Sequence, residues 1–75
     1  MTPAEKAIQD NGYRLDRRDT FAAAASLPLV HRAEAYPGEW VLWDPNDDED
    51  GYMIVGDDPE ELGREFISHF GDWLL

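Results

Sequence analysis

The clearest pattern of hydrophobic and polar residues lies near the C-terminus, and it predicts an amphipathic helix. Four apolar residues fall at i, i+4, i+5 and i+8 and therefore share one helical face: Leu62, Phe66, Ile67 and Phe70. Asp58 followed by Pro59 is a typical helix start, because the carboxylate caps free N–H groups and proline is tolerated at the first helical position. We expect the helix to end at Gly71, and Trp73 to fold back on the core.

Three preceding segments show a period of two, which is typical of β-strands: Leu29–Tyr36, Glu39–Asp44 and Gly51–Gly56. Pro37-Gly38, between the first two segments, suits the centre of a type II turn, because proline presets φ and glycine accepts a positive φ. Pro45–Asp50, between the second and third, reads as a polar loop. The pattern therefore predicts a three-stranded antiparallel β-meander packed against the C-terminal helix.

The N-terminal third predicts one or two short helices. Thr2 is suited to cap the first, and Gly12 to end it. A second helix fits Asp19–Ser26, although its apolar run, Phe21–Ala25, also fits an extended chain. Tyr13–Arg18 alternates and allows a short edge strand. Together these elements predict one small α+β domain over residues 1–75.

Negative charge is concentrated in the C-terminal part of the chain, and this distribution is the first indication of function. The net charge of the whole chain is −11. Residues 44–75 contain eleven acids and one base, Arg64, so this part carries −10. A protein with this charge repels nucleic acid and anionic membranes, and its natural electrostatic partner is a basic protein surface.

Composition also narrows the class of protein. The chain contains no cysteine, so disulfides and thiolate metal sites are excluded, and the core depends on apolar mass, including nine aromatic residues. No N-terminal signal sequence and no apolar run of membrane-spanning length is visible. We therefore expect a soluble, cytoplasmic protein.

One loop partly resembles the calcium loop of EF-hand proteins. Asn46, Asp48 and Asp50 stand at positions one, three and five, Gly51 at six and Asp57 at twelve. Position one is Asn rather than Asp, position twelve is Asp rather than Glu, and an apparent strand replaces the entering helix. An acidic hairpin loop is the favoured interpretation, with a calcium-binding module over Asn46–Asp57 as an alternative.

No residue pattern points to catalysis or to a cofactor. His31 and His69 are separated by 38 residues and share no zinc motif, so both are expected to be ordinary structural or surface histidines. Neither serine has the surroundings of a nucleophile. Arg14, Arg17 and Arg18 form a small basic cluster, which we expect to pair with carboxylates. The expected protein is therefore non-enzymatic, without metal or cofactor.

These observations lead to a hypothesis of a small acidic inhibitor that docks on the basic groove of a nucleic-acid-binding protein by imitating a polyanion. Its size and charge, though no motif, are similar to those of phage proteins that inhibit restriction or CRISPR complexes. Immunity proteins against nuclease toxins are an alternative. The expected partner-binding residues are Asp44, Asp47, Asp48, Glu49, Asp50, Asp57, Asp58, Glu60, Glu61 and Glu65. We expect their carboxylates to form one outward patch.

Overall fold

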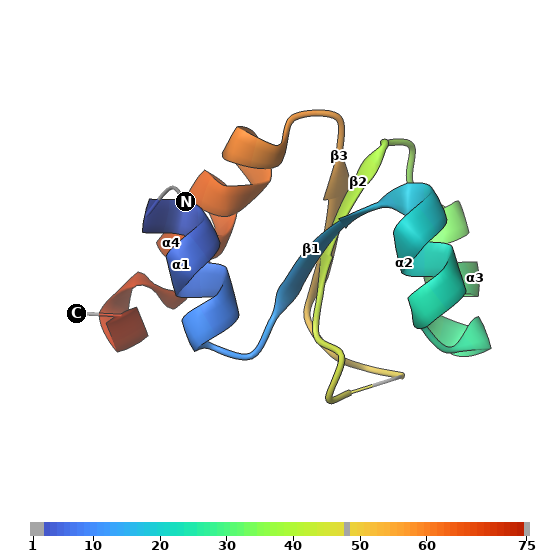
Figure 1. Ribbon diagram of the computed structural model, residues 1–75, viewed down its shortest axis with the longest axis horizontal. Coiled ribbons are helices and arrows are strands. Elements are labelled where there is room, and N and C mark those ends of the chain that lie inside the picture. The colour runs from blue at the N-terminus through green and yellow to red at the C-terminus, as the bar shows by residue number, and fades with distance from the viewer. Residues whose placement is uncertain (1–2, 48, 75) are drawn as a thin grey trace.

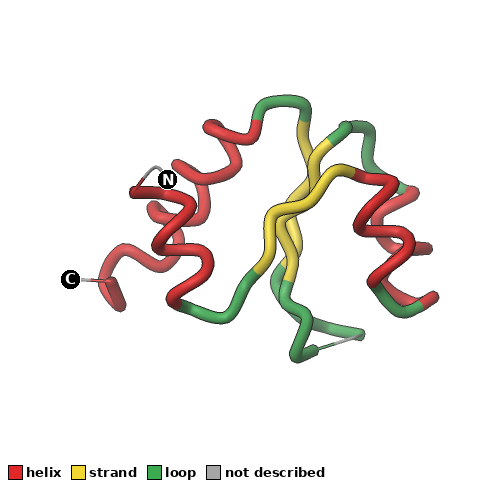
Figure 2. The backbone as a smooth tube through the Cα atoms, in the orientation of Figure 1, coloured by secondary structure: helices red, strands yellow, loops and turns green. Residues whose placement is uncertain are grey.

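The computed structural model describes residues 3–47 and 49–74, and the side chains of residues 5–47 and 49–70. Within these residues, four helices surround a three-stranded antiparallel sheet (Figures 1 and 2). The elements follow in the order α1 (Pro3–Asp10), β1 (Arg14–Arg17), α2 (Arg18–Ala24), α3 (Leu27–Glu34), β2 (Trp40–Trp43), β3 (Met53–Gly56) and α4 (Pro59–Leu74). The fold is a small α+β domain, as the sequence predicts.

The sheet has the order β1-β2-β3, with β2 in the centre. Arg14 pairs with Trp43 at one end of β1, and Trp40 pairs with Gly56 at one end of β3. The chain between β1 and β2 forms α2 and α3, which lie on one side of the sheet, while α1 and α4 lie on the other (Figure 1). The sheet is therefore the middle of three layers.

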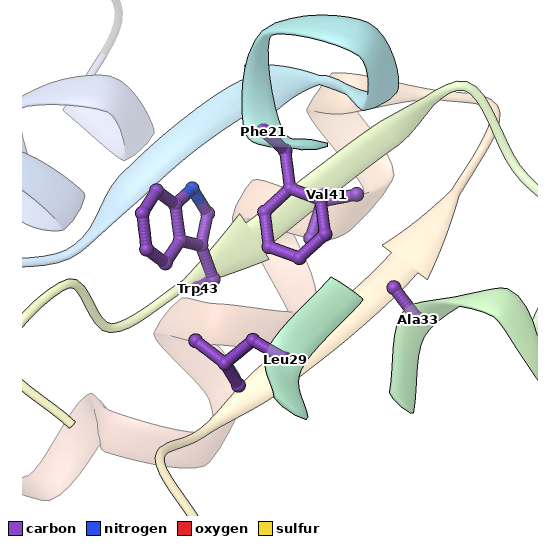
Figure 3. Packing of buried hydrophobic residues seen from close by; sticks show 5 residues of the cluster. All are labelled: Phe21, Leu29, Ala33, Val41 and Trp43. Atoms are coloured by element: carbon purple, nitrogen blue, oxygen red, sulfur yellow. The ribbon is translucent and has the colours of Figure 1, made fainter. Parts of the chain in front are cut away.

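The central strand supplies both halves of the core, because its side chains alternate between the two faces of the sheet. Val41 and Trp43 point toward α2 and α3, where they meet Phe21, Leu29 and Ala33 (Figure 3). The rings of Phe21 and Trp43 pack edge to face with their centroids 5.2 Å apart. This geometry is favourable for aromatic pairs.

On the opposite face, Leu42 is buried with Ile8 from α1 and with Leu62 and Phe66 from α4. A group of aromatic rings extends this half toward the C-terminus, and its members are Tyr13, Tyr52, Phe66, His69 and Phe70. The apolar stripe predicted for the C-terminal helix is thus the face that packs on the sheet.

The expected strand over Leu29–Tyr36 is wrong, because most of this segment belongs to helix α3. Leu29 and Ala33 are both buried, and a separation of four residues satisfies a helix as well as a period of two. Pro28 lies in the first turn of α3, where proline is well tolerated. The first strand of the sheet is instead β1, from the segment for which the sequence allows a short edge strand.

Two other boundaries differ from expectation. Pro37-Gly38 connects α3 to β2 rather than two strands, and Gly38 has a φ of 149°. Helix α4 continues through Gly71 to Leu74, so the expected end at Gly71 is wrong. The predicted cap Thr2 and the expected return of the Trp73 side chain to the core lie outside the described parts of the chain.

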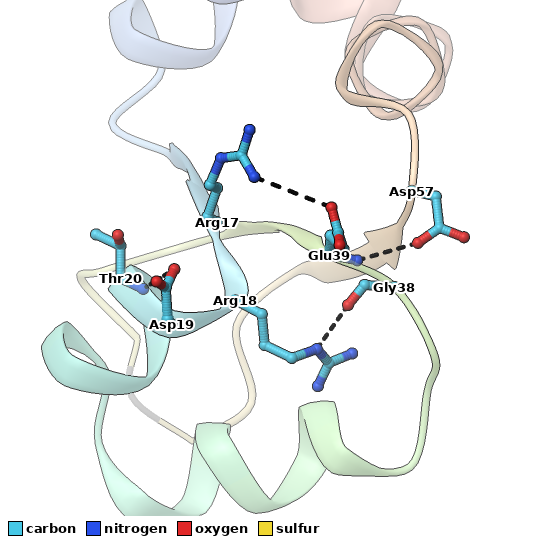
Figure 4. Close-up of polar contacts among 7 residues, drawn as sticks. All are labelled: Arg17, Arg18, Asp19, Thr20, Gly38, Glu39 and Asp57. Atoms are coloured by element: carbon cyan, nitrogen blue, oxygen red, sulfur yellow. Dashed lines mark hydrogen bonds and ion pairs between the residues drawn. The ribbon is translucent and has the colours of Figure 1, made fainter.

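Arg18 ties the two sides of the α3–β2 connection together. Its guanidinium donates hydrogen bonds to the carbonyl oxygens of Ala33, Tyr36 and Gly38, with 2.6 Å from Nε to the Gly38 oxygen (Figure 4). Ala33 lies in the last turn of α3 and Tyr36 lies two residues beyond the helix, close to its C-terminal end, where cations are favoured. Arg18 therefore stabilises both the end of α3 and the entry into β2.

Candidate partner-binding surface

Strand β3 forms an edge of the sheet, and the pairing determines which of its backbone groups face outward. Arg18 N donates to Glu39 O at 2.7 Å, so the bonds toward β1 involve Val41 and Trp43 of β2. Trp40 and Leu42 therefore bond toward β3, and their partners are Gly56 and Ile54. The N–H and C=O groups of the alternate residues, Met53 and Val55, point away from the sheet.

A groove of about 320 Å³ runs along this edge. It is lined by Arg32 and Tyr36 from the α3 side, by Met53, Ile54 and Val55 of β3, and by Glu65 of α4. Met53 and Val55 pack toward the α3 half of the core, whereas Ile54 belongs to the α4 half. The groove therefore has the strand edge as its floor and one helix on each side.

The acidic loop before β3 is held in shape by its own carboxylates. Asp44 Oδ1 accepts a hydrogen bond from Asn46 N at 2.9 Å. Asp47 Oδ1 accepts from Glu49 N at 3.3 Å and from Asp50 N at 3.1 Å. The side chains of Asp47, Glu49 and Asp50 are exposed, so they present negative charge to solvent while one of them orders the turn.

Arg32 attaches this loop to α3. Its guanidinium donates to the carbonyl oxygen of Glu49 at 2.8 Å and to that of Gly51 at 2.5 Å. These are backbone contacts, and they leave the carboxylate of Glu49 without an ion pair among the described residues. The loop is consequently placed at one end of β3 without losing its charge.

The acids after β3 occupy the other end of the strand. Asp57 Oδ1 accepts from Glu39 N at 3.1 Å (Figure 4), and Asp58 Oδ1 accepts from Glu60 N at 3.0 Å, as expected for a residue that caps α4. Glu60, Glu61 and Glu65 are exposed along the first turns of the helix. The charges of Glu60 and Glu61 lie in the first turn of α4, where negative charge is favourable.

The ten predicted partner-binding residues therefore form two groups rather than one. Asp44–Asp50 lies at one end of β3, and Asp57–Glu61 lies at the other, with Glu65 on the wall of the groove between them (Figure 1). Asp48 lies outside the described residues. For the other nine, the described lysine, arginine and histidine nitrogens make no ion pair with the carboxylates.

The same arrangement separates the residues of the EF-hand-like pattern. Asn46 and Asp57 lie at opposite ends of β3, and the Asp57 carboxylate accepts a hydrogen bond from the backbone N–H of Glu39. In the parts of the chain that the structure describes, no three acidic or histidine side chains are arranged to hold a metal ion.

The basic cluster is used within the fold. Arg14 pairs with Asp16 at 3.0 Å and lies over the ring of Trp43, and Arg17 lies 3.9 Å from Glu39. Arg18 instead binds backbone carbonyls. The expected partners were Asp16, Asp19 or carboxylates of residues 44–75, and the expectation holds for Arg14 with Asp16, whereas the partner of Arg17 is Glu39.

The two histidines have ordinary surroundings. His31 lies 3.7 Å from Glu34 on the exposed side of α3, and His69 stacks on Tyr52 with ring centroids 4.9 Å apart.

Burial raises the pKa of the Tyr52 phenol above its usual value of 10.0, and Glu65 and Tyr13 raise it further. The pKa of Tyr13 is also raised, by burial and then by Asp44.

The groove itself is not predictable from the sequence. The last strand of the predicted meander is an edge strand, so outward-facing backbone groups at Met53 and Val55 could be expected from the sequence. Arg32 and Tyr36 were not, because the expected strand over Leu29–Tyr36 placed them in the sheet.

In comparisons with known proteins, no family model, curated protein or solved structure matches the chain. Within the described residues, no helix combines the length and the apolar character that crossing a bilayer requires.

Proposed function

We propose that this protein is a non-enzymatic binding protein that docks on a basic protein surface and inhibits a nucleic-acid-binding protein by occupying its basic groove. The observation that supports the proposal is the placement of nine carboxylates at the two ends of β3 and beside its open edge, none of them in an ion pair with another described residue. Such groups keep their charge available for a partner.

The spacing of the two acidic groups suits a polyanion mimic. Residues 51–56 separate the groups, and the four of them that form β3, at about 3.3 Å each, alone span about 13 Å. This exceeds the Debye length of about 8 Å at physiological ionic strength, so each group attracts its own set of basic side chains. Phosphates of one DNA strand are spaced about 3.4 Å apart along the helix axis. A groove that binds several of them therefore carries basic side chains over a length comparable to the separation of the two acidic groups.

Capture of the partner from cells tests the proposal. The protein is immobilised, lysate is applied at low and at high salt, and the retained protein is identified. We expect a basic nucleic-acid-binding protein that is lost at high salt and that competes with nucleic acid for this chain. A partner retained equally at both salt concentrations, or one bound together with its nucleic acid, contradicts the proposal.

A matched pair of variants locates the contact. Glu49→Gln with Glu60→Gln removes one charge from each acidic group, and both carboxylates are without an ion pair among the described residues. Asp10→Asn with Glu34→Gln changes the net charge equally on α1 and α3. Because an exposed ion pair contributes about 0.2–1 kcal/mol, we expect the first pair to weaken binding about 2- to 30-fold. The control pair is expected to leave affinity nearly unchanged, and equal losses would refute the assignment.

A further inference from the structure

We propose that the open edge of β3 accepts an extended segment of the partner as an additional strand, and that this segment alternates basic and apolar side chains. The inference rests on the proposed function, since it names the part of a basic partner that enters the site. Backbone hydrogen bonds to β3 would then act together with the electrostatic attraction between the acidic groups and the basic partner.

The backbone of β3 supplies the first step. Met53 and Val55 direct their N–H and C=O groups out of the sheet, and these outward groups make no hydrogen bond with the described residues. Unpaired strand edges attract other strands, and proteins that use extended peptides as ligands bind them in this way. The groove along β3 gives such a strand room between α3 and α4.

The two walls of the groove determine the side chains of the ligand. On the α3 side, the added strand meets Met53, Val55, Tyr36 and Arg32, and Tyr36 is 57 % exposed. The Arg32 guanidinium donates to the carbonyl oxygens of Glu49 and Gly51, and its charge disfavours a basic side chain on this wall. On the α4 side it meets Glu65, with Glu61 one helical turn earlier. Because alternate side chains of a strand point to opposite faces, the apolar set lies toward α3 and the basic set toward α4.

Charge also decides between a partner and a second copy of this chain. If two β3 strands paired in antiparallel fashion, the acidic loop of one copy would lie beside Asp57 and Asp58 of the other, at both ends of the pair. In a parallel pair, each acidic group would face its own duplicate. Like charges placed opposite each other are destabilising, so a basic segment is the favoured occupant.

A synthetic peptide tests the inference on the unmodified protein. The probe is a capped nine-residue peptide that alternates lysine and valine, titrated by calorimetry and by backbone NMR. Two derivatives carry N-methyl groups, one at every lysine and one at every valine. Since only one set of amides faces β3, we expect one derivative to bind about 10- to 100-fold more weakly and the other to bind like the parent.

The protein side offers a second measurement. Met53→Pro removes one outward N–H at the start of the strand, a position where proline is tolerated, and Met53→Leu keeps it. We expect weaker peptide binding only for the proline variant, and NMR shifts centred on Met53 and Val55. If the proline variant does not fold, the N-methylated peptides still decide the question.

Failure of this inference differs from failure of the proposed function. Equal affinity of both N-methylated peptides and of a peptide with its lysines and valines in separate blocks would overturn strand addition. In that case the salt-sensitive partner and the Glu49/Glu60 effect would still stand. Concentration-dependent dimerisation that is abolished by Met53→Pro would also overturn the inference, in favour of a second copy.

Discussion

Replacement of Gly38 by alanine tests the joint between α3, β2 and β3. A Cβ atom at Gly38 would lie 2.7 Å from the backbone nitrogen of Gly56 and 2.8 Å from its Cα and carbonyl carbon. Contacts this short with backbone atoms cannot be relieved by turning a side chain. The φ of 149° is also a conformation that alanine avoids. We therefore expect Gly38→Ala to separate β2 from β3 at this end.

The cost is the sum of two effects. Backbone strain in a region reserved for glycine costs about 1–3 kcal/mol. Separation of the strands also weakens the hydrogen bond from Glu39 N to Asp57 and the one from Arg18 to Gly38 O, at about 1 kcal/mol each. The expected loss is about 3–5 kcal/mol, out of a total stability of about 4–11 kcal/mol for a chain of this length.

Gly12→Ala is the matched control. Gly12 also has a positive φ, 80°, but a Cβ there would meet only Asn46 Nδ2, at 3.5 Å, which is ordinary contact. We expect a loss of about 1–2 kcal/mol, from φ alone. Urea unfolding followed by tryptophan fluorescence measures both, because Trp43 is buried in the core. With a slope of about 1 kcal/mol per molar urea, the two midpoints differ by about 1–4 M, and equal midpoints would refute the reasoning.

Two further predictions concern stability. Arg18→Met should destabilise the protein by about 2–4 kcal/mol, because three carbonyls lose a charged donor, whereas Lys6→Met at the exposed pair with Asp10 should cost less than about 1 kcal/mol; equal losses in urea unfolding would contradict the capping role. The raised pKa of Tyr52 means that the folded protein keeps a phenol proton at pH values where the unfolded chain has lost it. The stabilisation is therefore complete below the ordinary pKa of 10.0 and is lost as pH rises through the folded value; Tyr52→Phe should flatten this decline in unfolding free energy, and an unchanged slope would contradict it.

Where several local signals agreed, the sequence predicted structure correctly. Asp58 as a cap, Pro59 after it and the stripe from Leu62 to Phe70 all indicated the start of α4 and its buried face. The alternation around Trp40–Trp43 likewise predicted a strand, and that strand is the centre of the sheet. Such features can be predicted from the sequence because a helix cap and an amphipathic stripe each depend on residues only a few positions apart.

The candidate site could be predicted only in part from the sequence. The acids were visible as a composition bias, and their exposure followed from charge. That they divide between the two ends of β3 depends on where the chain turns after Asp50 and Gly56. That Glu65 shares a groove with Arg32 depends on α3 and α4 lying on opposite sides of the same strand edge.

The sequence by itself determined the charge, the amphipathic C-terminal helix and a sheet with a hydrophobic central strand, because each is a property of neighbouring residues. Only the tertiary structure decided that Leu27–Glu34 is a helix and that Arg14–Arg17 pairs with β2. Leu29 and Ala33 fit either period, so the choice is made by the Phe21 and Trp43 rings against which they pack. The sequence also made β3 an edge strand, as the last strand of the predicted meander. The groove beside that edge was decided by the tertiary structure, because Arg32, Tyr36 and Glu65 line it through contacts between residues far apart in the chain.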